Sequence, residues 1–187
     1  MNQFPKHIKL SKVYILLYNM SKIECVQCIA LTRSGKGPAC KNRACVTSEF
    51  CAAHTRSLFD LYLKPSSIPR SGKGLFTSKA IKKNQNIARY TGVIKTKEEF
   101  EADPSDYGIE ISRGRAVDAV STQSAIGRYA NDCRTADKNE KHCAGNNARF
   151  VVSYKGNKPN IHVRAIKNIP ANSEIFVSYG RKYWKDR

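Results

Sequence analysis

Short apolar stretches recur along the chain after residue 70, with polar positions between them. Most of these stretches hold four to six residues, several alternate apolar with polar side chains, and glycines or other turn residues separate them. This pattern is typical of short β-strands. Strands are predicted at Leu75–Phe76, Ile87–Tyr90, Val93–Ile94, Ile109–Ile111, Ala116–Val120, Phe150–Tyr154, Ile161–Ile166 and Ile175–Tyr179. The fold class is therefore mainly β, built from several small sheets.

One segment of this region carries the signature of a helix start. Thr96 can act as an N-cap, and Glu99 stands three residues later at the capping-box position. A short helix is therefore predicted to begin after Thr96. The six acids from Glu98 to Glu110 have no Lys or Arg among them, and two interpretations stay open. They either guide a basic peptide substrate or form a solvated helix face.

The first third of the chain differs from the rest in composition. Residues 1–20 are basic and apolar without a clear period, and they are expected to form an N-terminal arm. Residues 21–56 hold most of the cysteines, and residues 57–67 run into prolines and serines that are typical of a linker. Residues 68–187 would then form the β domain. No run approaches the roughly 20 apolar residues that span a membrane, and no secretion signal is present, so an intracellular protein without membrane contact is expected.

Five of the seven cysteines lie within thirty residues of one another, next to a histidine. In a chain without a secretion signal, this clustering favours a metal site over disulfides. Thiolates and imidazole suit Zn²⁺. Two pairs, Cys25 with Cys28 and Cys51 with His54, are spaced so that both members can reach one tetrahedral ion from a tight turn. The preferred ligand set is Cys28, Cys40, Cys51 and His54. In the alternative sets, Cys25 or Cys45 replaces Cys40.

The segment from Cys28 to His54 is similar to a short zinc-binding Cys/His module found in many viral and eukaryotic proteins. So short a segment cannot bury a core of its own, and bound zinc would supply its folding free energy. A looser group, formed by Cys133, His142 and Cys143, is interpreted as ordinary loop thiols and a loop histidine rather than as a second metal site.

The chain carries 33 Lys and Arg against 15 Asp and Glu, a formal charge of +18. A surplus of this size favours polyanionic partners, and a contact with DNA or RNA through basic surface is expected. The plain alternative is a well-solvated surface, because charge alone names no ligand.

Four motifs follow one another in the β region. They are Ser71–Phe76 (SGKGLF), Tyr90–Gly92 (YTG), Arg128–Cys133 (RYANDC) with Asn146–Phe150 (NNARF), and Glu174–Trp184 (EIFVSYGRKYW). Each alone is weak, but in this order they resemble the SET-domain protein lysine methyltransferases, and the ending looks most like the compact viral members. The resemblance runs from about Ile68 to Trp184. It implies a SET fold with a knot-like C-terminal threading, preceded here by the small zinc-stabilised module.

The resemblance also implies a function. The family transfers a methyl group from S-adenosylmethionine to a lysine amine, so a protein-lysine N-methyltransferase acting on histone or another basic protein is expected, in the nucleus or on chromatin. The alternative is an inactive SET scaffold that serves as a zinc-dependent chromatin or nucleic-acid binding module. The sequence does not predict the oligomeric state.

Individual positions match the family's functional residues. The cofactor-binding residues implied are Gly72, Lys73, Gly74, Leu75, Tyr90, Arg128, Asn131, Tyr179 and Trp184. The amide of Asn131 can donate to a carboxylate and accept from an ammonium, as a methionine-like zwitterion requires. Tyr179 matches the catalytic tyrosine, and Tyr107 falls where the family places another tyrosine of the lysine channel. Tyr183 would form a third wall of that channel, and the alternative for Tyr107 and Tyr183 is core packing. Their hydroxyls would orient the amine, so the catalysis is mainly one of positioning.

Two positions leave alternatives open, and a third departs from the family pattern. Arg128 either contacts the cofactor carboxylate or belongs to a structural ion pair. Trp184 either stacks on the adenine or closes the core. Asp132 stands where the family commonly has histidine, and this departure bears on the adenine-side contact.

Overall fold

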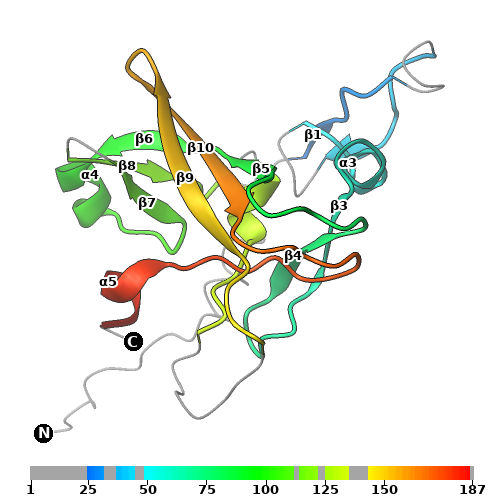
Figure 1. The fold of residues 1–187 in the computed structure, drawn as a ribbon. Helices are drawn as coiled ribbons and strands as arrows, with labels where there is room; N and C mark the ends of the chain where they lie inside the picture. The colour runs from blue at the N-terminus through cyan, green and yellow to red at the C-terminus, as the bar shows by residue number, and fades with distance from the viewer. Residues whose placement is uncertain are drawn as a thin grey trace, which may run out of the picture.

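The computed structural model describes residues 25–31, 37–44, 49–111, 114–121, 125–134 and 143–185. The expected N-terminal arm lies outside these ranges. The elements follow in the order β1 (Val26–Gln27), β2 (Arg43–Ala44), α3 (Ala52–Phe59), β3 (Leu61–Pro65), β4 (Lys73–Thr77), β5 (Asn86–Tyr90), β6 (Val93–Thr96), α4 (Lys97–Ala102), β7 (Gly108–Ile111), β8 (Arg115–Asp118), η1 (Ile126–Tyr129), β9 (Ala148–Lys155), β10 (Lys158–Ala165) and α5 (Gly180–Lys185) (Figure 1). Strands predominate, which confirms the mainly β fold class.

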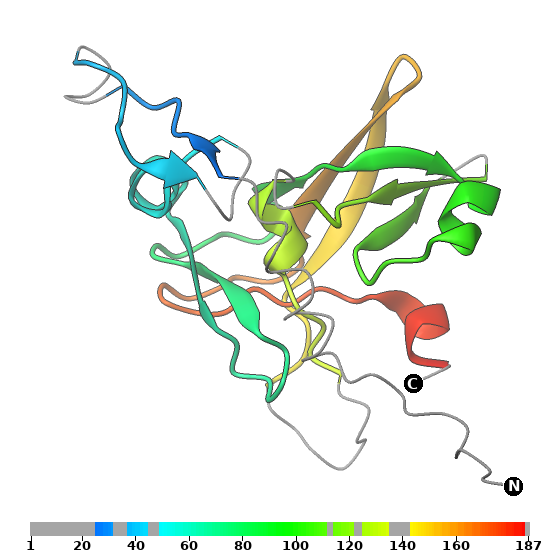
Figure 2. The ribbon, with the colours of Figure 1, turned by 180° about the vertical axis from the view of Figure 1, so that it is seen from behind.

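Within the described ranges, the strands form four small antiparallel sheets. Two sheets have three strands, in the orders β5–β10–β9 and β6–β8–β7, and the other two are the pairs β3–β4 and β1–β2. The long β9–β10 hairpin rises from the middle of the molecule, with the β6–β8–β7 sheet and the β3–β4 pair on opposite sides (Figures 1 and 2). The Cys/His segment with α3 lies at one end.

The structure confirms seven of the eight predicted strands. The eighth, Ile175–Tyr179, makes isolated bridges in place of a strand ladder. One bridge joins Glu174 to Phe76, and the other joins Phe176 to Asn131. Because this segment passes between β4 and the residues after η1, it pairs briefly with each and continuously with neither. The last sequence motif is thereby brought against the first and the third.

The segment 57–67, expected to be a linker, is part of the folded structure. It contains the end of α3 and the strand β3, which pairs with β4 from Leu61 opposite Thr77 to Pro65 opposite Lys73. Pro65 occupies the last position of an edge strand, where a missing N–H is tolerated. The proline therefore marks the end of a strand, and the β domain begins before residue 68.

The helices of the described chain are short. α4 confirms the predicted helix start, because the Thr96 hydroxyl oxygen accepts from the Glu99 N–H at 3.2 Å and the Glu99 carboxylate accepts from the Thr96 N–H at 2.8 Å. α3 ends at Phe59, and the C-cap residue Asp60 has a left-handed φ of 57°. No helix in the described ranges is long and apolar enough to cross a membrane.

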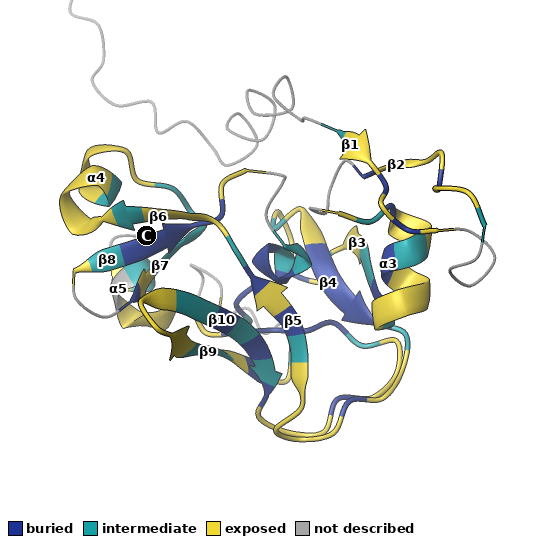
Figure 3. Cartoon of the chain, turned by 90° about the horizontal axis from the view of Figure 1, so that it is seen from above, coloured by how far each residue is buried: buried dark blue, intermediate teal, exposed yellow. Residues whose placement is uncertain are grey.

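Two apolar cores hold the β domain together. The larger one joins β3, β4, β5, β9 and β10 to the C-terminal segment, and its Leu75, Val163, Ile175 and Val177 have no exposed surface. The smaller one joins the β5–β10–β9 sheet to the β6–β8–β7 sheet. Figure 3 shows this burial along most of β4 and β8. The cores therefore fix the segments that carry the four motifs relative to one another.

Candidate active site and Cys/His cluster

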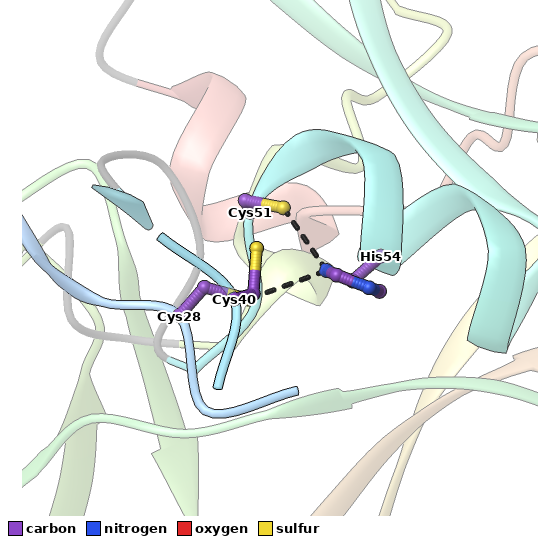
Figure 4. A group of neighbouring side chains, drawn as sticks. All are labelled: Cys28, Cys40, Cys51 and His54. Carbon is purple, nitrogen blue, oxygen red and sulfur yellow. Dashed lines mark hydrogen bonds between the residues drawn. The ribbon is translucent and has the colours of Figure 1, made fainter. Parts of the chain in front are cut away.

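Three cysteines and one histidine of the N-terminal segment point toward a common centre (Figure 4). Cys28 follows β1, Cys40 precedes β2, Cys51 is the N-cap of α3, and His54 lies in the first turn of that helix. Their ligand atoms all lie within 4.8 Å of one another, and the three cysteines are buried and free. The structure thus brings together the preferred ligand set. Of the alternative ligands, Cys25 is disulfide-bonded and Cys45 lies outside the described ranges.

The donor set suits one zinc ion. The Nδ1 atom of His54 lies 3.5 Å from Sγ of Cys28 and 3.3 Å from Sγ of Cys51. Two ligand atoms on a tetrahedral Zn²⁺ are expected about 3.5–3.8 Å apart. Burial by itself raises the pKa of Cys51, but hydrogen bonds from the backbone and ring of His54 lower that pKa to about 6. The backbone N–H of Asn42 lowers the pKa of Cys40, whereas burial and the neighbouring thiols raise it, with a net rise. A cation at the centre would stabilise all three thiolates together.

Backbone conformation and close packing shape the first motif. Gly72 has a left-handed φ of 69°, which glycine adopts without strain, and its carbonyl accepts from the Ser66 N–H at 2.8 Å. A Cβ at Gly74 would overlap the carboxylate of Glu174, so this glycine is needed for packing. Leu75 is fully buried in the larger core. Leu75, which the resemblance assigns to the cofactor, therefore anchors this motif in the larger core.

Asn131 connects three of the motifs. Its Nδ2 donates to the carbonyl oxygen of Lys73 at 3.1 Å and to Oε1 of Glu174 at 3.5 Å. Its backbone carbonyl accepts from the Val177 N–H at 2.9 Å. The side-chain oxygen Oδ1 accepts no hydrogen bond from the described residues, and it is not among their fully enclosed polar atoms that lack a partner. Asn131 therefore keeps one accessible acceptor beside the first motif.

Sequence reasoning missed the structural role of Glu174. This carboxylate is 6% exposed and accepts hydrogen bonds from the Ser66 hydroxyl at 2.6 Å and from the Ser67 N–H and hydroxyl, both at 2.8 Å. It thereby ties the residues after β3 to the C-terminal segment. The sequence signal for burial was the position of this acid directly before the apolar residues 175–177. Its two serine partners, however, lie more than a hundred positions away in sequence.

Asp132 holds the C-terminal segment in place. Its Oδ2 accepts from the Tyr179 N–H at 2.7 Å and from Nε1 of Trp184 at 2.9 Å. Its Oδ1 accepts from the Arg134 N–H and from Nδ2 of Asn146, both at 3.0 Å. Asp132, which departs from the family pattern, thus accepts hydrogen bonds from four donors. Two of these bonds fix the backbone of Tyr179 and the position of α5.

Tyr179 lies among aromatic rings with its hydroxyl against the backbone. The hydroxyl donates to the carbonyl oxygen of Ala130 at 3.0 Å. The ring meets Tyr183 edge to face at 4.8 Å and lies nearly parallel to Trp184 at 6.5 Å. Burial raises the pKa of Tyr179 well above its usual value, and the phenols of Tyr183, Tyr90 and Tyr107 and the carboxylate of Asp132 raise it further. Tyr179 is therefore a neutral phenol at physiological pH.

Arg128 and Tyr90 support Tyr107. The guanidinium carbon of Arg128 lies 4.0 Å from the centre of the Tyr107 ring, within the range of a cation–π contact. Its nitrogens donate to the carbonyls of Ala119 at 2.6 Å and Val120 at 2.9 Å, and none of the described carboxylates lies within ion-pair distance. The hydroxyl of the buried Tyr90 donates to the Tyr107 carbonyl at 2.6 Å. Both residues, assigned to the cofactor by resemblance, are engaged in positioning Tyr107.

Most of the acids on and beside α4 already have partners within the protein. Glu99 belongs to the capping box, Glu101 lies 3.9 Å from Lys97, and Asp103 lies 3.3 Å from Lys95. Lys95 also pairs with the buried Asp118 at 2.9 Å. These contacts favour the interpretation of a solvated helix face over that of a guide for a basic peptide.

Cys133 and Cys143 differ from their expected state. They were expected to be ordinary loop thiols, but a disulfide joins them, with 5.9 Å between their Cα atoms. The Cys133 N–H donates to Oδ1 of Asn146 at 2.9 Å, and Asp132 bonds the same side chain. These bonds bring the two ends of the loop together. His142 lies outside the described ranges.

Comparison with known proteins identifies the family. Residues 72–180 match the SET domain family, and because this match covers more than half of the chain, the chain belongs to the SET domain family. A search of curated proteins finds no match.

Solved structures of polycomb repressive complex 2 share the fold. The Chaetomium thermophilum complex matches at 24% identity with a TM-score of 0.53, over 64% of this chain and 15% of that chain. An active form in the basal state matches at 25% identity with a TM-score of 0.52 over the same shares. An autoinhibited form bound to S-adenosylmethionine matches at 24% identity with a TM-score of 0.52, again over 64% and 15%. The chain thus spans about 15% of the length of the chains it resembles.

Proposed function

We propose that this protein is an S-adenosylmethionine-dependent protein-lysine N-methyltransferase that acts on histone or another basic protein. The observation that carries the proposal is the meeting of three distant segments in a chain of the SET domain family. The Tyr179 hydroxyl lies against the Ala130 carbonyl, and the next residue, Asn131, holds the first motif through Lys73. Nuclear or chromatin location is proposed with the histone-like substrate.

We assign cofactor binding to residues whose polar groups are not already engaged by other groups of the protein. When bound, S-adenosylmethionine supplies the methyl group and a positively charged sulfonium. The accessible Oδ1 of Asn131 would accept from an ammonium, and the backbone of Gly72 to Gly74 offers further polar groups. Arg128 is left out because protein oxygens and aromatic rings engage its guanidinium. Trp184 closes the aromatic cluster, since Asp132 holds its indole nitrogen.

The tyrosines would prepare the lysine for reaction. A lysine amine with a pKa of about 10.4 must lose its proton before it can act as a nucleophile. A desolvating channel lined by Tyr107, Tyr179 and Tyr183 would disfavour the charged amine. Because burial raises its pKa, Tyr179 stays protonated, and its oxygen and the Ala130 carbonyl oxygen would orient the amine and the methyl group.

We further propose that the N-terminal segment binds one structural zinc ion. Cys28, Cys40, Cys51 and His54 would occupy all four tetrahedral positions, which leaves none open for catalysis.

One of the similar structures was solved with H3K27me3, and for the present chain the histone-like substrate rests on family membership.

The test is methyl transfer from labelled S-adenosylmethionine to core histones, nucleosomes and ribosomal proteins. Tyr179→Phe should lower the rate by about 10²–10³-fold, because it removes one oriented polar group from the reacting centre. The matched control is Tyr62→Phe, since the Tyr62 hydroxyl makes no hydrogen bond with the described residues and its ring stacks on Phe76. Transfer that survives Tyr179→Phe would remove this residue from the mechanism. Absence of both transfer and cofactor binding would favour the inactive scaffold.

A further inference from the structure

One face of the β5–β10–β9 sheet is strongly basic. In antiparallel pairing, residues opposite each other share a face, and β10 pairs with both neighbours. His162 lies opposite Arg89 on β5 and Val151 on β9, and Arg164 lies opposite Arg149. Alternate residues of the same strands point into the cores. The outer face therefore gathers cations from all three strands.

The basic face extends beyond these rows in both directions. Toward the hairpin tip, Lys155 pairs with Lys158, and both are exposed. At the other end, the Lys83 N–H donates to Oδ1 of Asn168 at 2.9 Å, which places the Lys82–Lys83 loop beside the end of β10. The charged residues that the strand pairing places on this face are Arg89, Arg149, Lys155, Lys158 and Arg164. Three exposed lysines, Lys82, Lys83 and Lys167, follow in the loops beside the end of the sheet.

Acidic residues are missing from the segments that build this face. Residues 61–97 and 144–173 contain no Asp or Glu. Within the described ranges, none of the eight cations lies in an ion pair. Glu49 lines the cavity of about 470 Å³ that also touches Arg89 and His162, at the edge nearest the Cys/His cluster. The unpaired charges elsewhere on the face are available to an anionic partner.

The dimensions of the face fit a double helix. The eight residues of β10 span about 26 Å at about 3.3 Å per residue. Over that length a DNA duplex presents about 15 phosphate charges. The paired outer rows carry arginine, lysine and histidine but no Phe, Tyr or Trp, whereas platforms for single strands use large aromatic rings on which bases stack. Contact with a phosphate backbone is therefore favoured over stacking on separated bases.

We infer that the outer face of the β5–β10–β9 sheet binds the phosphate backbone of double-stranded DNA without reading its sequence. The face is separate from the Tyr179 site, so the inference does not depend on the proposed methyl transfer. Part of the large positive charge of the chain would then serve to bind phosphates on this face. Phosphate contacts of this kind weaken as salt rises, because each one releases condensed counterions.

The test measures binding of the full chain to a labelled DNA duplex by fluorescence anisotropy over a range of salt concentrations. The face variant is Arg149→Gln/Lys155→Gln/Lys158→Gln. It should bind at least about tenfold more weakly, and the slope of log affinity against log salt should fall by about 3, or about 1 for each lost contact. The matched control, Lys41→Gln/Lys64→Gln/Lys97→Gln, removes the same charge from the Cys/His segment, β3 and α4, and should keep the slope.

Several outcomes would overturn the inference. Equal losses in the two triple variants would show attraction by net charge alone. Tighter binding of one strand than of the duplex would show a single-strand site, and absence of duplex binding at low salt would end the case. Should the face variant unfold early in a thermal scan, Lys155→Gln and Lys158→Gln are measured singly. Each is then expected to lower the slope by about 1, and an unchanged slope in both contradicts the inference.

Discussion

The Cys/His segment and the SET domain are held together by different interactions. The buried cluster of the Cys/His segment consists of three cysteines and Ala30, with Phe50 packed against it. The larger core of the SET domain instead buries branched apolar side chains such as Leu75, Val163 and Ile175 completely. With the proposed zinc ion bound, the first region would depend on its ligand atoms, whereas the second depends on the removal of apolar surface from water.

Exposed apolar residues sharpen this difference. Ile29, Leu31, Leu58 and Phe59 of the Cys/His segment and α3 are 49–60% exposed. Their surface contributes little to folding. Among the described residues of this segment, no large apolar core stands beside the cysteine cluster. We therefore expect loss of metal to unfold the Cys/His segment and loss of core packing to destabilise the SET domain.

The largest expected effect is that of metal removal on the Cys/His segment. Apparent binding free energies of structural zinc reach about 10–16 kcal/mol, so a strong chelator or Cys51→Ser should unfold this segment while the SET domain keeps its protection. Hydrogen exchange followed by mass spectrometry measures both regions at once. Ser57→Ala, on an exposed position of α3, is the matched control. Equal protection of residues 37–59 with and without chelator would refute the metal-dependent fold.

Next in size is the same substitution made in each region. Leu75→Ala should lower the free energy of unfolding of the SET domain by about 2–5 kcal/mol, because it leaves a cavity in the core. Leu58→Ala, at a side chain that is 55% exposed, should change it by less than about 0.5 kcal/mol. Denaturant titration of both variants measures the difference. Similar losses would mean that the two regions share one core.

A smaller effect is expected where Asp132 ties the C-terminal segment to the SET core. Asp132→Asn replaces one carboxylate oxygen by an amide NH₂ group, which would face two N–H donors. This change should lower the free energy of unfolding by about 1–3 kcal/mol. Trp184 is the single tryptophan and contacts this carboxylate, so its fluorescence should shift toward that of a solvated indole. Glu98→Gln on exposed α4 is the control. An unshifted emission spectrum in Asp132→Asn would show that the bond does not hold α5.

Most of the fold could be predicted from local sequence patterns. Alternation and turn residues located seven strands, and the Thr96–Glu99 pair located α4. The strand β3 was missed because Pro65 and the following serines dominate the local signal, while the pairing that orders them comes from β4. The segment Ile175–Tyr179 has the composition of a strand, but its two different neighbours prevent a ladder.

The candidate site was predictable as a set of motifs and not as a set of contacts. Cysteine spacing named the four residues that meet at the Cys/His centre. Arg128 gave no sign in the sequence that aromatic rings and backbone carbonyls would engage it. The tasks of Asp132 and Glu174 likewise depend on partners 47 and 107 positions away, which only the folded chain brings together.

Distant segments are proposed to form one binding site for S-adenosylmethionine, and calorimetric titration with this cofactor measures that binding. One site per chain is expected. Asn131→Ala should weaken binding by about tenfold or more, because it removes both the accessible acceptor and the bond to Lys73. Asn160→Ala, on the outer face of β10, should leave the affinity unchanged. A chain that binds no S-adenosylmethionine, or binds it equally in both variants, would contradict the account.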